Sequence, residues 1–226
     1  MADIKINLRK IRDEIPSGIT LVAVSKTKPN EDIMLAYDQG QRIFGENKVQ
    51  ELMAKQPDLP DDIQWHMIGH LQTNKVKYIA PWVSMIHSVD RLKLLRYINK
   101  EAKKNDRKIE CLLQFHIAEE STKFGLDPDE AQKILESDEY KAMENVEIRG
   151  VMGMATFTDD MVQVQREFNN LNGIFHQLKE TFFAGDASFK EISMGMSNDY
   201  KIAVKEGATM LRLGSTIFGA RNTKHQ

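Results

Sequence analysis

The sequence predicts a single (β/α)8 barrel (TIM barrel) of the α/β class, preceded by one extra N-terminal helix. Eight short apolar runs alternate strictly with helical segments, a pattern that implies a parallel sheet. The 226 residues suit the compact end of the size range of such barrels. With no linker, low-complexity segment or change of composition, residues 1–226 are assigned to one domain. An open doubly wound sheet is less favoured, because no Gly-x-Gly-x-x-Gly motif follows the first strand.

The extra helix and the strands are predicted from the spacing of apolar residues. Residues 4–15 repeat isoleucine and leucine at helical intervals, and Pro16-Ser17-Gly18 ends that helix. Nearly continuous apolar runs indicate strands buried on both faces, and the run 191–193 is the weakest of them. The predicted strands are residues 19–26, 42–44, 64–68, 83–89, 109–117, 146–154, 191–193 and 210–213.

The helices between the strands show start signals and apolar faces. Proline is favoured in the first turn of a helix, as at Pro128. Asp90 is expected to cap the helix that carries Leu92, Leu95 and Ile98. The other predicted helices begin near residue 29, follow residue 47, span 74–79, run from about 159, span 199–205 and begin at 214–215.

Composition excludes several classes of protein. The chain is 41% hydrophobic and 28% charged with a net charge of -2, so no basic stripe indicates binding to nucleic acid or to an anionic membrane. The N-terminus lacks an apolar signal core, and no segment is long enough to span a membrane, so we expect a cytoplasmic protein. The single cysteine, Cys111, is expected to be a buried strand residue.

Lys26 closes the first strand and is the most informative residue. The carboxyl end of a barrel strand is where such folds place their chemistry. An apolar wall behind the lysine disfavours its ammonium form, and a neutral amine is what a Schiff base with an aldehyde or ketone requires. The alternative is an ordinary solvated lysine at a strand end.

Two loops offer a phosphate site at the same end of the barrel. Strand seven leads into Ser193-Met194-Gly195-Met196-Ser197, and strand eight into Arg212-Leu213-Gly214-Ser215. Phosphate sites in this fold form from the loops after strands seven and eight and the start of a short helix. Both loops combine glycine, hydroxyls and backbone amides at a helix start. The alternative is a pair of ordinary Gly/Ser helix caps.

Other polar residues fall at the same predicted end. Arg212 is expected to point toward the barrel mouth near Lys26, and Asn47 follows the second strand, where it is either a site residue or a helix cap. His66 and His70 flank the third strand's end but lack a third ligand, so no metal site is predicted. Methionines at two strand ends suit core packing or one wall of a pocket for a flat ring. They are Met152, Met154, Met194 and Met196.

Together these residues indicate pyridoxal 5'-phosphate (PLP). Lys26 would hold the aldehyde, the two loops the phosphate, and Arg212 the ring nitrogen. A Schiff-base aldolase without bound cofactor also combines a lysine with a phosphate site in a barrel. Its lysine, however, usually comes from a middle strand rather than from the first.

The chain closely resembles the YggS/PROSC family of pyridoxal phosphate homeostasis proteins, over essentially its whole length. The matching motifs, in chain order, are Val22-Ala23-Val24-Ser25-Lys26, Phe44-Gly45-Glu46-Asn47, Trp65-His66-Met67-Ile68-Gly69-His70-Leu71-Gln72-x-Asn74-Lys75, Ser88-Val89-Asp90, Lys123-x-Gly125, Arg149-Gly150-Val151-Met152-Gly153-Met154, Ser193-Met194-Gly195-Met196-Ser197-x-Asp199 and Arg212-Leu213-Gly214-Ser215-x-Ile217-Phe218-Gly219.

The resemblance implies a fold-type III barrel like the N-terminal domain of alanine racemase, with PLP held as a Schiff base on Lys26. It implies the cofactor-binding residues Lys26, Asn47, Met194, Ser197, Arg212, Gly214 and Ser215. Relatives often carry threonine in place of Ser215, and the hydroxyl is kept.

The predicted role is a cofactor carrier and regulator in PLP homeostasis, without robust turnover and with no catalytic residue assigned. Racemisation needs acid–base groups on both faces of the substrate Cα. Alanine racemases take one of them from an additional β domain, which we do not expect here because the sequence stops at Gln226. A small PLP-dependent amino-acid racemase is the alternative. Expected partners are PLP and, transiently, PLP-dependent apoenzymes. A monomer is expected, as is no binding to nucleic acid or membrane.

Overall fold

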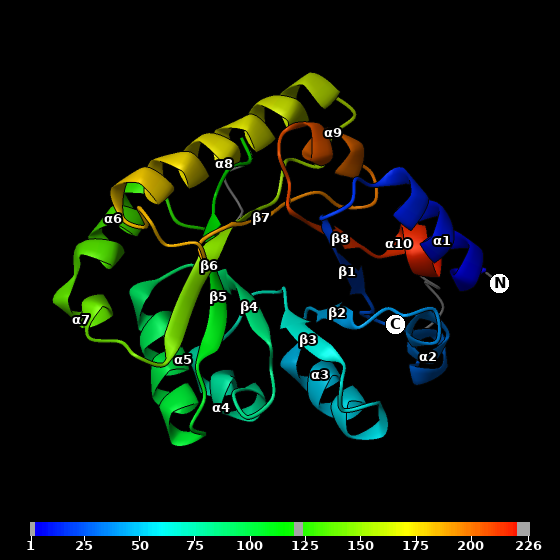
Figure 1. Cartoon of the computed structure of the whole chain (residues 1–226), viewed down its shortest axis with the longest axis horizontal. Coiled ribbons are helices and arrows are strands. Elements are labelled where there is room, and N and C mark those ends of the chain that lie inside the picture. The colour runs from blue at the N-terminus through cyan, green and yellow to red at the C-terminus, as the bar shows by residue number, and fades with distance from the viewer. Residues whose placement is uncertain (1–2, 120–123, 221–226) are drawn as a thin grey trace.

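Eight parallel strands close into a barrel surrounded by helices in the computed structural model, which describes residues 3–119 and 124–220 (Figure 1). Each strand pairs with the next in chain order, and β8 pairs with β1. The TIM barrel predicted from the sequence is therefore confirmed. The strands are β1 (Thr20–Val24), β2 (Ile43–Glu46), β3 (Gln64–Met67), β4 (Met85–Val89), β5 (Ile109–Phe115), β6 (Val146–Gly153), β7 (Glu191–Ser193) and β8 (Met210–Leu213).

The extra helix α1 packs against α2 and α10, and α8 crosses the outside of the barrel near β6 and β7 (Figure 1). Two short 3-10 helices, η1 (Gln56–Asp58) and η2 (Thr73–Lys75), precede β3 and α4. The α-helices are α1 (Ile4–Glu14), α2 (Asn30–Tyr37), α3 (Val49–Lys55), α4 (Val76–Ile79), α5 (Leu92–Lys104), α6 (Pro128–Glu136), α7 (Asp138–Lys141), α8 (Met161–Thr181), α9 (Tyr200–Lys205) and α10 (Ser215–Phe218).

Most predicted element boundaries agree with the structure, whereas the helix cap expected at Asp90 and the cap considered as an alternative at Asn47 do not form. Asp90 does not cap α5, because Arg91 occupies the N-cap position and makes no side-chain cap bond. The Asp90 carboxylate instead contacts Arg91 and lies 3.3 Å from His70 Nδ1. Asn47 is not a helix cap either, since Lys48 precedes α3. The short helix α7 was not predicted from the sequence.

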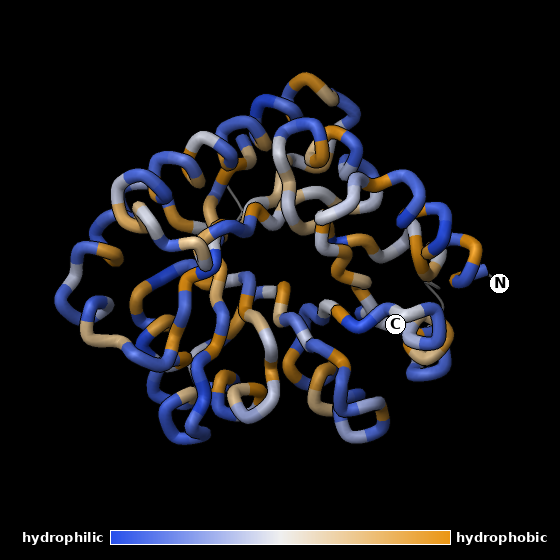
Figure 2. The backbone as a smooth tube through the Cα atoms, viewed as in Figure 1, coloured by the Kyte–Doolittle hydropathy of each residue, from blue (hydrophilic) through white to orange (hydrophobic). Residues whose placement is uncertain are grey.

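The core has two parts, as a barrel requires. The larger part lies between the strands and the surrounding helices, and apolar and polar residues alternate along those helices (Figure 2). The smaller part fills the barrel interior with side chains from several strands. Its buried members are Val22, Met85, Leu112, Met152 and Met210. Cys111 is buried in β5, as expected, and burial raises the pKa of its thiol.

Gly150 marks a point where the sheet accepts no side chain. The register of β5 against β6 shifts between Cys111 and Leu112, so β6 bulges just before Gly150. Gly150 has φ +154°, and a Cβ built on it would lie 1.8 Å from the backbone oxygen of Glu191 in β7. The glycine therefore allows β6 and β7 to pair closely.

We expect Gly150→Ala to lower the free energy of unfolding by about 3 kcal/mol or more, because the new methyl group meets backbone that cannot move without breaking the sheet. Chemical denaturation checks this value. Gly173→Ala is the matched control, since Gly173 lies within α8 with nothing within 4 Å of the added Cβ. That change should raise stability by about 0.5–1 kcal/mol, and a similar small effect at residue 150 would contradict the analysis.

Candidate functional site

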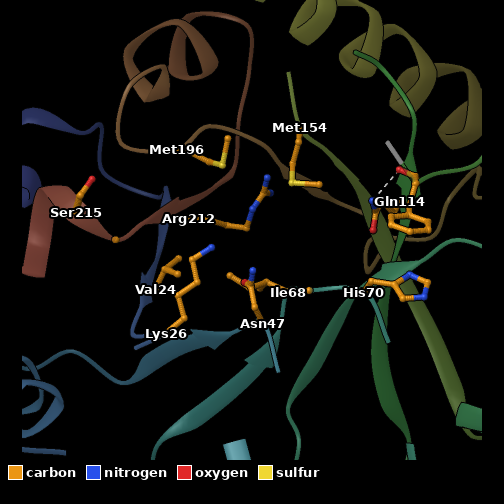
Figure 3. Close-up of a pocket in the computed structure, with 13 residues that line it drawn as sticks. Val24, Lys26, Asn47, Ile68, His70, Gln114, Met154, Met196, Arg212 and Ser215 are labelled. Atoms are coloured by element: carbon orange, nitrogen blue, oxygen red, sulfur yellow. Dashed lines mark hydrogen bonds between the residues drawn. The ribbon is translucent and has the colours of Figure 1, made fainter. Parts of the chain in front are cut away.

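A cavity of about 270 Å³ opens at the carboxyl ends of the strands, close to the lower limit of about 300 Å³ usual for small-ligand pockets. Figure 3 shows Lys26, Asn47 and Arg212 around one space, with Met154 and Met196 beyond the arginine and His70 and Gln114 on the far side. The lining residues are Val24, Lys26, Asn47, Ile68, Gly69, His70, Gln114, Phe124, Met154, Met196, Arg212, Gly214 and Ser215.

A buried ionic cluster behind β1 fixes the backbone that carries Lys26. Lys55 Nζ donates to the backbone oxygen of Ser25 at 2.8 Å, to Glu46 at 2.7 Å and to Glu51 at 2.9 Å. The Ser25 hydroxyl donates to the same Glu46 oxygen at 2.6 Å. Burial raises the pKa of the Glu46 carboxyl, and the charge of Lys55 opposes that shift. The residue before Lys26 is thus held by both its side chain and its carbonyl.

Arg212 places a buried positive charge at the floor of the cavity. Its side chain is 4% exposed and donates to Ser193 Oγ at 2.6 Å and to the backbone oxygen of Gly153 at 2.9 Å. Burial lowers its pKa to about 10, with the charge of Asp199 acting in the opposite direction. A group with that pKa remains protonated at neutral pH, so Arg212 is a cation that only donates hydrogen bonds.

Two histidines continue this network into the barrel interior. Ser193 Oγ lies 3.0 Å from His87 Nδ1, and His87 Nε2 lies 2.9 Å from His66 Nδ1. Burial lowers the pKa of His66 to about 3 and that of His87 well below its usual value, the latter with help from the charges of His66 and Arg212. Both rings are therefore neutral.

The neutral rings pass hydrogen bonds in one direction from the arginine. Arg212 donates to Ser193, whose hydrogen is then directed to His87 Nδ1. With His87 Nδ1 accepting, His87 Nε2 carries the hydrogen and donates it to His66 Nδ1, so every polar hydrogen in this network has an acceptor. The network fixes the position of the guanidinium without neutralising it.

The loops after β7 and β8 meet at backbone amides. The Ser197 hydroxyl accepts from the amide of Gly214 at 3.4 Å and from that of Thr216 at 3.2 Å. Gly214 and Ser215 line the cavity, and Gly214 approaches Val24 of β1 so closely that a Cβ on it would lie 3.3 Å from the Val24 oxygen. The amides of Gly214 and Thr216, which donate to Ser197 here, would meet a phosphate that replaced Ser197 as their acceptor, so we call this group the phosphate cradle.

His70 and Phe124 form the far side of the cavity, and Asn47 lies between Lys26 and His70 (Figure 3). A Cβ on Gly69 would lie 2.3 Å from the backbone oxygen of Asn47, so only glycine allows the loops after β2 and β3 to touch here. His70 stacks on Phe124 with ring centroids 4.4 Å apart, and Gln114 Nε2 donates to the Phe124 carbonyl at 2.9 Å. These contacts give the cavity one flat aromatic side.

The structure brings most of the predicted site residues to the cavity. Lys26, Asn47, Arg212, Gly214 and Ser215 line it, and Ser197 contacts the Gly214 amide. It does not bring Met194 there, because that side chain is fully buried in the outer core.

Among the methionines that the sequence places at strand ends, Met154 and Met196 line the cavity, whereas Met152 and Met194 are buried. Sequence reasoning missed several lining residues, which are Val24, Ile68, Gly69, Gln114 and Phe124. Their positions at strand ends are the signal that could have found the first four. Phe124 follows β5 in a loop, and Lys123 beside it lies outside the described residues.

Two negative findings apply to residues 3–119 and 124–220. No group of three or more histidine, cysteine, aspartate or glutamate side chains could hold a metal ion there. No helix in these ranges combines the length and apolar character needed to cross a bilayer.

The buried histidines predict a loss of stability in acid. Each has a folded-state pKa below its unfolded value of about 6.5. Between that value and the folded-state pKa of about 3 of His66, the unfolded chain binds more protons than the folded protein, so the free energy of unfolding falls as the pH falls. His66→Gln should therefore reduce the slope of unfolding free energy against pH between pH 6 and 4 by about 1.4 kcal/mol per unit. Urea titrations at several pH values measure the slope.

His176→Gln is the matched control, because His176 is exposed on α8 and outside this network. It should leave the slope unchanged. An unchanged slope in His66→Gln as well would show that the buried rings do not control acid stability.

Comparison with known proteins identifies the family. The family model described as alanine racemase, N-terminal domain, matches residues 1–222. A pyridoxal phosphate homeostasis protein of Pasteurella multocida is 36% identical over 211 residues, covering 91% of this chain and 88% of the relative. The protein of that name from Escherichia coli K12 is 34% identical and covers 98% of both chains.

Solved structures of other proteins share the fold. PipY of Synechococcus elongatus PCC7942 with PLP bound has a TM-score of 0.86 and 35% identity, and the match covers 96% of this chain and all of PipY. An alanine racemase of Clostridium difficile has a TM-score of 0.78 at 16% identity, which shows a shared fold, and the match covers 58% of that enzyme. The chain therefore belongs to the family of pyridoxal phosphate homeostasis proteins, built on the alanine racemase N-terminal domain.

Proposed function

We propose that this protein binds pyridoxal 5'-phosphate at the barrel mouth and acts in cofactor homeostasis as a carrier and regulator. The observation that carries the proposal is the convergence of an amine, a guanidinium and a cradle of amides on one cavity. These groups belong to Lys26, Arg212 and the loop at Gly214-Ser215.

The residues present fit this cofactor. Lys26 would hold its aldehyde carbon, Arg212 would face its ring nitrogen, and Ser197 with the amides of Gly214 and Thr216 would hold its phosphate. The aromatic and thioether side chains of Phe124, Met154 and Met196 provide apolar surface for the ring. When bound, PLP supplies an aldehyde that captures amines and a ring that accepts electrons.

Relatives support the assignment. Proteins named pyridoxal phosphate homeostasis protein are 34% to 37% identical to this chain, and the PipY structure contains PLP. The sequence similarity covers the strand ends that form the cavity, because it extends over most of both chains.

Arg212 makes the bound ring a weaker electron acceptor without excluding catalysis, so the presence of a second base decides. A guanidinium cannot accept a hydrogen bond, so a ring nitrogen facing it stays unprotonated, and the ring withdraws electrons less well than one with an acidic partner. Among the cavity residues in the described part of the chain there is no tyrosine to serve as a second base. We infer little or no turnover from these two features.

A small amino-acid racemase remains the second candidate, and one observation favours it. His70 lines the cavity and lies 3.3 Å from the Asp90 carboxylate, an arrangement that can orient an imidazole for proton transfer. His70 is also stacked on Phe124, and that contact supports a wall of the pocket equally well.

Three further expectations accompany the proposal. The protein is expected to act as a monomer in the cytoplasm and to deliver PLP transiently to PLP-dependent apoenzymes. Size-exclusion chromatography with light scattering tests the first of these, and transfer of absorbance to an added apoenzyme tests the last.

The purified protein loaded with PLP should be yellow, and borohydride should fix the colour onto Lys26. Lys26→Ala should abolish the fixed label, because no amine then occupies that strand end. Peptide mass spectrometry after digestion locates the label.

Lys28→Arg is the control for the neighbouring lysine. Lys28 Nζ donates to the Phe218 carbonyl at 2.9 Å, and arginine keeps a donor there while removing the amine. This variant should retain the label on Lys26, and a label found on Lys28 in the unaltered protein would contradict the assignment.

Incubation with single amino-acid enantiomers in deuterated water separates carrier from racemase. The carrier proposal expects no sustained exchange of the Cα proton, as followed by NMR. Sustained exchange that disappears in both Lys26→Ala and His70→Gln would establish the racemase instead, with His70 as the second base.

A further inference from the structure

A second cavity of about 240 Å³ lies beside the first. Asn47 and His70 line both cavities, so the two share a wall. The remaining residues come from the loop and helix after β2 and from the loop after β3. They are Lys48, Val49, Gln50, Gln72 and Lys75.

The second cavity carries positive charge and donor groups. Two lysines and two glutamines line it, and no carboxylate does so in the described part of the chain. Neither Lys48 nor Lys75 has a carboxylate of a described residue within 4.0 Å, whereas the neighbouring His70 and Arg91 both contact the Asp90 carboxylate. Lys75 Nζ lies 5.8 Å from the ring centroid of Tyr78, and such a cation–π contact offsets its charge only in part.

Concave sites lined by charges of one sign concentrate counter-ions, because the low-dielectric walls focus the field. Ammonium groups bind carboxylates and phosphates through charge-assisted hydrogen bonds, and the side-chain amides of Gln50 and Gln72 can add neutral ones. Lys48 is exposed and Lys75 half-buried, so the site is open to small molecules arriving from solvent.

We propose that this second cavity is a subsite for the carboxylate or phosphate group of a small organic anion, seated next to the cofactor cavity. The shared wall of Asn47 and His70 means that an anion held here alters the surroundings of whatever occupies the first cavity. This coupling rests on the function proposed above, whereas the subsite itself rests only on the lysines and the cavity.

The test uses protein loaded with PLP and treated with borohydride, so that the first cavity and its phosphate cradle are filled. Inorganic phosphate and succinate are titrated in separate arms by calorimetry at low ionic strength, and the visible absorbance of untreated loaded protein is followed in parallel. Lys48→Gln, Lys75→Gln and the double variant are compared with Lys77→Gln. That control removes the same charge from the neighbouring helix at a residue that does not line the cavity.

We expect saturable binding of at least one anion, weakened about threefold by each single substitution and about tenfold by the double one, and unchanged in Lys77→Gln. Binding should also weaken as sodium chloride is added, because salt screens exposed charges. The phosphate and succinate arms show which source of anion is preferred.

Absence of saturable binding to either anion, or equal weakening in Lys77→Gln and the double variant, would overturn the proposal. Failure of the cofactor assignment has a different signature, namely no colour fixed by borohydride. In that case the same titrations are made on unloaded protein. Weaker anion binding by the Lys48 and Lys75 variants than by Lys77→Gln still supports the subsite, and equal binding rejects it.

Discussion

The pairing of β1 with β8 is the contact on which the site depends. Four residue pairs, from Thr20 with Met210 to Ala23 with Leu213, close the barrel and join the two ends of the chain. Because the strands are parallel, their carboxyl ends meet at one face. Lys26 after β1 therefore lies beside Arg212 and the Gly214 loop of β8, although nearly the whole sequence separates them. Without closure, neither the amine nor the phosphate cradle would have a partner.

Closure also creates a polar layer inside the barrel, and the polar groups in this layer need hydrogen-bond partners within the protein. The guanidinium of Arg212 is buried, and a buried charge without partners is costly. Ser193 and the Gly153 carbonyl accept its hydrogen bonds, and the neutral rings of His87 and His66 extend the chain. The ionic cluster around Lys55 serves the same purpose behind β1. The first network holds the Arg212 guanidinium in one position, and the second holds the backbone just before Lys26.

The geometry suits a protein that keeps a reactive aldehyde available and controlled. One wall carries Lys26 and Arg212, and the other carries the stacked pair His70 and Phe124, with the second cavity beyond. The proposed function depends on which groups line this mouth. An amine and a cation suit the binding and orientation of a cofactor, while proton transfer on two faces of a substrate needs a second positioned group. Only His70 in the described cavity wall resembles such a group.

Local signals in the sequence are enough to predict the barrel, its eight strands, and Lys26, Arg212 and the Gly214-Ser215 loop at one end, because apolar runs, turn residues and strand-end lysine, arginine and glycine are read from short segments. The sequence also indicated the Ser197 loop through its glycine and hydroxyls. The methionines that face the cavity could be identified only in the folded chain: Met194 and Met196 both follow β7, Gly195 between them has φ +90°, and Met194 is buried in the core while Met196 lines the cavity. Tertiary structure alone decided the partners of Asp90, the hydrogen bonds of His66 and His87, and the second cavity. Each of these depends on side chains from different strands meeting in space, and spacing along one segment carries no information about such meetings.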